Sequence, residues 1–255
     1  MYYLSLGTTD ETMNQFILYF FIGVYGPFIG SIITTKYYGS FKDVLDLFKK
    51  LFIWRMPLIN YLTVIVLPLI FFGSGIGLYA LFVGPIGSFE NKVWAIPALL
   101  LNSVRIGPLG EELGWRGFLL PELQKYNSPL KTALIIGFIH FIWHLPLFWA
   151  PFGTLVSGEP LSVFFILTYL ALVTCWSVVQ SWLVNNSNGS VLISILFHLF
   201  INAGVALLFF PMLASDSHAS KVVYYASAVV TIPFVIYLAL RTKLEPGKGN
   251  LRVSG

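Results

Sequence analysis

The stretch PLINYLTVIVLPLIFFGSGIGLYALFV, residues 57–83, contains no charged side chain. A helix needs about 20 apolar residues to cross the hydrocarbon core of a bilayer, and this stretch is long enough. The whole chain shares its character: 57% of the 255 residues are hydrophobic and 10% are charged, and the mean hydropathy is +0.81. Soluble domains carry about 25% charged residues. The sequence therefore predicts an all-α, polytopic membrane protein.

Seven apolar segments are long enough to predict about seven transmembrane spans. The third is unusual because it is long and interrupted by Gly107, Pro108 and Gly110. We expect one membrane-embedded domain over residues 1–255, with its main motifs in 105–205 and a cytoplasmic tail at 241–255. The segments are 15–35, 57–83, 93–123, 130–150, 161–184, 190–213 and 221–240.

The connector between the first two segments predicts a basic amphipathic helix, because its apolar residues recur at helical spacing from Phe41 onward. Such a helix either lies in the headgroup region or packs under the bundle. Basic residues gather in regions 36–55, 116–131 and 241–252, which share one side if there are seven spans. The positive-inside rule then places the C-terminus in the cytoplasm and the N-terminus outside, in a membrane we expect to be prokaryotic. These basic residues lie beside the apolar spans and form no single patch, so the net charge of +4 does not indicate nucleic-acid binding. We expect no nucleic-acid partner.

Ionisable side chains inside spans are costly and mark candidate functional sites. Glu112 and Arg116 in the third span are four residues apart, so we expect them to pair on one helix face. Glu111 is rotated about 100° away from that face. A carboxylate without a paired cation in apolar surroundings suits a general base. We therefore expect different roles for the two glutamates.

Two further spans carry polar residues, namely His144 in the fourth, and His198 with Asn202 one turn later in the sixth. Glu111, His144 and His198 lie about 18, 20 and 12 Å from the cytoplasmic ends of their spans. We expect these three side chains to line one cavity open toward the cytoplasm. Glu111 and His144 can there activate a water for peptide hydrolysis, with His198 and Asn202 stabilising the oxyanion.

A zinc site remains an open alternative, because Glu111, His144 and His198 form a familiar ligand set. His140 lies one turn before His144, as in the helix of zinc proteases, but position 141 is Phe where those helices have Glu. This difference favours a structural interpretation of His140.

These residues resemble the CPBP family, also called the Abi or type II CAAX-protease family of intramembrane proteases. Its signature is Glu-Glu-x-x-x-Arg, Phe-x-x-x-His and His-x-x-x-Asn, each on its own transmembrane helix. Residues 111–116, His144 and residues 198–202 match in that order. The similarity extends to residues 21–28 and the basic connector. One difference is His140, where the family pattern usually has Phe.

The resemblance implies that Glu111 and His144 activate the water, that His198 and Asn202 stabilise the oxyanion, and that Glu112 and Arg116 support the site. Family members have been described both as metalloproteases and as glutamate-dependent enzymes. Eukaryotic relatives trim prenylated CAAX proteins, so the expected partners are membrane lipids and a membrane-associated peptide or protein substrate, which can be prenylated.

Two other classes of protein are compatible with this composition. A non-catalytic immunity factor or scaffold would not need so many intramembrane polar groups. A proton-coupled transporter would also use buried Glu and His, but we find no clear internal repeat between the halves. The sequence therefore favours an intramembrane endopeptidase.

Overall fold

The computed structural model describes residues 10–85, 96–149, 162–209 and 217–244. Within these ranges the regular elements are all helices, which confirms the predicted all-α class. Small parts of the expected spans and most of the expected tail lie outside the described residues, namely 93–95, 150, 161, 210–213 and 245–255.

Four of the described helices are long and apolar enough to cross a membrane, judged by length and composition. They are α4 (Leu58–Phe82), α8 (Pro129–His144) with its 3₁₀ extension η5 (Leu145–Trp149), α9 (Val163–Asn185) and α12 (Ser217–Thr242). Their outer faces expose large apolar side chains such as Leu69, Leu167 and Val229. Such surfaces are stable against lipid tails but not against water. The observed helices therefore agree with the prediction of a membrane protein.

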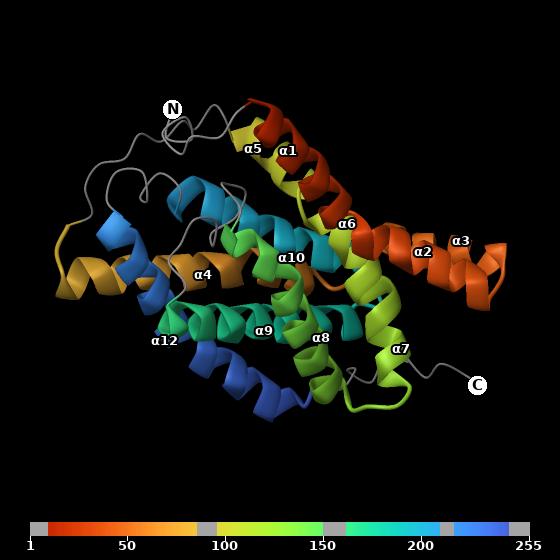
Figure 1. Cartoon of the computed structure of the whole chain (residues 1–255). Coiled ribbons are helices and arrows are strands. Elements are labelled where there is room, and N and C mark those ends of the chain that lie inside the picture. Colours follow the sequence, from red (N-terminus) through yellow and green to blue (C-terminus); the bar gives the residue numbers. More distant parts are fainter. Residues whose placement is uncertain (1–9, 86–95, 150–161, 210–216, 245–255) are drawn as a thin grey trace.

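The remaining apolar helices are shorter or bent. The helices α1 (Asp10–Val24) and α2 (Gly26–Tyr38) meet at a bend of 43° and would together form a fifth crossing. The helix α10 (Val191–Gly204) continues into the π-helical turn η6 (Val205–Phe209). The expected number of seven spans therefore stays a prediction. In Figure 1, α8 crosses α9, and α12 packs against both α4 and α9.

The third expected span, residues 93–123, is not one continuous helix, in line with its interruption by glycine and proline in the sequence. It consists of α5 (Ile96–Arg105), α6 (Pro108–Glu112), the π-helical η4 (Leu113–Leu119) and α7 (Leu120–Gln124). The break occurs at Gly107, whose φ of 110° favours glycine. Pro108 follows as the first residue of α6, where its fixed φ suits a helix start. The glutamates thus follow a break in the backbone.

A close approach brings the main chains of α2 and this broken segment together. A side chain at Gly114 would collide with the main chain of Pro27 in α2. Glycine at this position therefore lets α2 lie directly on η4. Glu111 and Glu112, which come just before η4, are buried, with 4% and 0% of their surfaces exposed.

The connector contains α3 (Phe41–Lys49) and the 3₁₀ turn η2 (Lys50–Phe52). Its inner face, Val44 and Leu47, is buried, while Phe41 on the other side is exposed. The helix therefore both packs on the bundle and presents apolar surface outward. Hydrogen bonds from Lys49 and Lys42 hold the pKa of Asp46 down to about 2.

Three hydrogen bonds bring the basic regions together at one end of the bundle, which we call the basic end. Lys50 Nζ donates to the Gly117 carbonyl at 2.6 Å, and Ser190 Oγ donates to the Ile53 carbonyl at 2.7 Å. Asn185 Nδ2 donates to the Leu244 carbonyl at 3.1 Å. These contacts place the described parts of the three basic regions on one side. Its assignment to the cytoplasm stays a prediction.

Candidate active site

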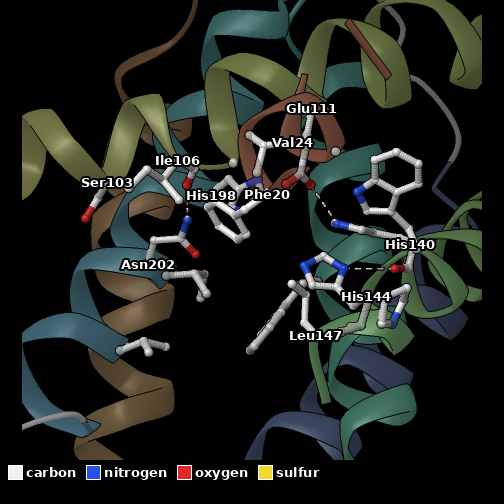
Figure 2. Close-up of a pocket in the computed structure, with 18 of the residues that line it drawn as sticks. Phe20, Val24, Ser103, Ile106, Glu111, His140, His144, Leu147, His198 and Asn202 are labelled. Carbon is white, nitrogen blue, oxygen red and sulfur yellow. Dashed lines mark hydrogen bonds and ion pairs between the residues drawn. The ribbon is translucent and has the colours of Figure 1, made fainter. Parts of the chain in front are cut away.

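One cavity of about 980 Å³ gathers four of the six polar site residues that the sequence analysis selected, and Glu112 and Arg116 are not among its lining residues (Figure 2). Glu111, His144, His198 and Asn202 all line it, as expected, and His140 joins them. Its volume lies within the range of ligand pockets, about 300–1,000 Å³. The rest of the lining is largely apolar and includes Phe16, Phe20, Val24, Ile139, Trp143 and Leu147.

The cavity extends from these polar residues away from the basic end. It is lined by the last turns of α8 and by α10 from residue 197 onward. At the basic end, Gln124 Nε2 donates to Asn185 Oδ1 at 3.3 Å. Our expectation that the cavity opens toward the cytoplasmic side stays a prediction.

Glu112 is the centre of a buried hydrogen-bond network. Arg116 Nη1 donates to its Oε1 at 3.1 Å, and both side chains are fully buried. This ion pair confirms the pairing predicted from their spacing. Three further donors approach the same carboxylate, from Gln180 at 2.9 Å, Ser194 at 2.7 Å and His198 at 2.7 Å. A buried carboxylate with this many donors is held in one position.

The bond to Glu112 determines which nitrogen of His198 faces the cavity. Its Nδ1 carries the proton donated to Glu112, so Nε2 of the neutral ring has a free lone pair. His198 can therefore donate to an oxyanion only as an imidazolium. Asn202 Nδ2 donates one N–H to the Ile106 carbonyl at 3.2 Å (Figure 2). The second N–H of this amide is left for a ligand.

Three polar atoms from different parts of the site surround Gly107. A Cβ at this residue would lie 3.2 Å from Asn202 Nδ2, 3.3 Å from His198 Nε2 and 3.4 Å from Glu111 Oε1. These atoms therefore meet around one point. The positive φ at Gly107 and the absence of a side chain keep that point open.

Glu111 has a partner that we did not predict. His140 Nε2 lies 2.9 Å from Glu111 Oε2, and both side chains are buried. The expected neighbour, His144, instead donates from Nδ1 to the His140 carbonyl at 2.9 Å (Figure 2). The second nitrogen of His144, Nε2, then bears a lone pair in the neutral ring. His140 therefore does more than fill space between helices, because its ring binds Glu111.

The possible metal ligands also differ from the expected set. Among the described residues, ligand atoms of Glu111, His140 and His144 lie within 4.8 Å of one another. His140 thus takes the place that we expected for His198, which is not in this group. Two imidazoles and one carboxylate are a ligand set that zinc proteins use. The donor chemistry of this cluster therefore fits zinc.

Comparison with known proteins agrees with this geometry. Residues 92–204 match the family described as Type II CAAX prenyl endopeptidase Rce1-like. A curated relative, CAAX prenyl protease 2 of Methanococcus maripaludis, is 26% identical over 219 residues, which are 81% of this chain and 77% of the relative. Both matches support the resemblance to the CPBP family. All the polar residues of the site lie within the matched part of the chain, which supports its being a membrane protease.

Proposed function

We propose that this protein is an intramembrane endopeptidase that hydrolyses a peptide bond with a water activated by Glu111 and His144. One observation carries the proposal. A carboxylate, two imidazoles and a carboxamide from α6, α8 and α10 line a single, largely apolar cavity. Neither a scaffold nor a lipid-facing helix needs such a convergence.

The distances leave room for the water between Glu111 and His144. Their ligand atoms lie within 4.8 Å of each other, a separation that one water can bridge with a hydrogen bond to each. As the water attacks the peptide carbonyl, the Glu111 carboxylate accepts its proton. When the tetrahedral intermediate collapses, Glu111 returns this proton to the departing amine. His144 orients the water through Nε2, since its Nδ1 is engaged with His140.

The oxyanion of the intermediate would be stabilised by Asn202 and His198. Asn202 supplies its second amide N–H, and His198 supplies Nε2–H when it is an imidazolium. Both residues are in α10, one turn apart, and both line the cavity.

The apolar part of the cavity supports the proposal that the substrate carries a lipid. Phe20, Ile139 and Leu147 border the polar cluster, so a hydrocarbon chain attached near the scissile bond would be removed from water there. The name of the M. maripaludis relative, CAAX prenyl protease 2, points to the same substrate class. We therefore propose a prenylated peptide or protein as the substrate.

A quenched fluorescent peptide ending in S-farnesyl-cysteine and three further residues tests the proposal. We expect the purified protein to cleave it at least about tenfold more efficiently, in kcat/KM, than the same peptide with free cysteine. The expected difference follows from the burial of the prenyl chain, since each buried methylene contributes about 0.8 kcal/mol. Equal cleavage of both peptides would show that the protein does not recognise the prenyl group. No cleavage of either would favour the scaffold class.

A zinc-dependent version of the same reaction deserves a test because the Glu111, His140 and His144 cluster fits the metal. Bound there, zinc would supply a Lewis acid and favour ionisation of a coordinated water. The metal-free version needs only the side chains already described. We favour it because a buried glutamate beside a histidine suffices as the general base.

Metal analysis of the purified protein and a chelator titration separate the two versions. We expect substoichiometric zinc and an unchanged cleavage rate after treatment with chelator. If zinc performs the chemistry, the chelator should abolish cleavage, and added zinc should restore it. The apo protein refilled with magnesium serves as the control, since magnesium prefers oxygen ligands over imidazoles.

A further inference from the structure

His140 is a buried polar residue of the cavity that has no role in the proposed reaction so far. It lies in α8 one turn before His144, with 7% of its surface exposed. Its ring packs between those of Trp115 and His144, with centroid distances of 5.7 and 4.6 Å. The ring is therefore held in a fixed orientation.

This orientation directs Nε2 of His140 at one oxygen of Glu111. The 2.9 Å contact to Oε2 is the one hydrogen bond that the Glu111 side chain makes within the described part of the chain. An ionised Glu111 can only accept, so Nε2 of His140 is the donor. Without this bond, the carboxylate could rotate about its last single bond, because such terminal torsions are broad.

The other oxygen of Glu111 faces a different environment. Oε1 lies 3.4 Å from the point where a Cβ on Gly107 would be, near Asn202 Nδ2 and His198 Nε2. Oε1 is therefore on the side of the groups that would hold an oxyanion, while Oε2 is on the side of His140. The two oxygens of one carboxylate are thus not equivalent.

We propose that His140 is a positioning residue that binds Oε2 of Glu111 and so leaves Oε1 as the oxygen that accepts the proton of the attacking water. The main chain of the same residue helps, because the His140 carbonyl accepts from Nδ1 of His144 and orients that ring. One residue of α8 thereby orients both groups that activate the water. The inference rests on the proposed function.

Two substitutions at this position separate positioning from packing. His140→Phe keeps an aromatic ring but removes the donor, and we expect kcat to fall about 10- to 100-fold with KM unchanged, because misplaced reacting groups lose about this much. His140→Gln restores an N–H at nearly the same place and should recover most of kcat. A residue that only fills space would not be rescued in this way. His218→Gln, on the exposed start of α12, is the matched control and should leave kcat unchanged.

A double-mutant cycle on thermal unfolding tests the contact without any substrate. We expect the shifts in Tm of His140→Phe and Glu111→Ala not to add, because both remove the same interaction. Additive shifts would overturn the inference, as would a kcat of His140→Phe equal to that of the wild type. If His140→Gln is no better than His140→Phe and also loses bound zinc, His140 is a metal ligand instead. Failure of the wild type to cleave would count against the proposed function, and the cycle would still report on His140.

Discussion

Glu111→Gln should lower kcat for peptide cleavage by about 100- to 10,000-fold while the protein remains folded. The amide keeps the shape of the side chain and can still bond to His140, but it cannot accept the proton of the water. The change is measured with the farnesylated reporter peptide, and folding is followed by the Tm in detergent. We expect a Tm close to that of the wild type, because Glu111 has a single hydrogen-bond partner among the described residues.

The matched control is Glu122→Gln in α7, whose carboxylate is exposed and pairs with Lys125 at the surface. It makes the same chemical change away from the cavity and should leave kcat and Tm unchanged. Cleavage by Glu111→Gln at nearly the wild-type rate would refute the metal-free and the zinc-dependent versions together. The protein would then belong to the scaffold class.

Arg116→Ala should destabilise the fold by about 3–5 kcal/mol, because it leaves the buried charge of Glu112 without its cation. Both side chains of this pair are inaccessible to solvent. The effect is measured as the loss of Tm and of folded yield in detergent, independently of activity. Lys125→Ala is the control at an exposed ion pair and should cost at most about 1 kcal/mol.

A second variant tests whether the uncompensated charge is the cause. Adding Glu112→Gln to Arg116→Ala removes that charge, so the double variant should be more stable than the sum of the two single effects predicts. If Arg116→Ala melted like the wild type while Glu111→Gln aggregated, the roles that we assign to the two glutamates would be reversed.

The sequence could predict the parts of the site that depend on local geometry. Glu112 and Arg116 are four residues apart, and their pairing survives even though residues 113–119 are π-helical. The polar residues expected in the cavity could also be identified, because charged and amide side chains stand out in apolar spans. The break at Gly107 could be predicted too, since glycine and proline interrupt the apolar segment there.

The contacts between helices could not be predicted in the same way. His140 is 29 residues from Glu111, and Ser194 is 82 residues from Glu112. Helices such as α8 and α9 are apolar on all sides, so periodicity does not reveal which face is buried. His140 and His144 share a face, and only the way in which the helices pack decides which of them meets Glu111. Serine in an apolar helix carries no signal of its own, because it can bond to its own backbone.

The unequal surroundings of the adjacent glutamates have an evolutionary consequence. Glu112 joins η4, α9 and α10 through Arg116, Gln180, Ser194 and His198, whereas Glu111 bonds to His140. Selection for an intact bundle alone would thus retain Glu112 and tolerate changes at Glu111. A lineage that no longer needed proteolysis would lose Glu111 first and still inherit a folded membrane protein. Inactive descendants with binding roles can therefore arise from such a protease by a single substitution.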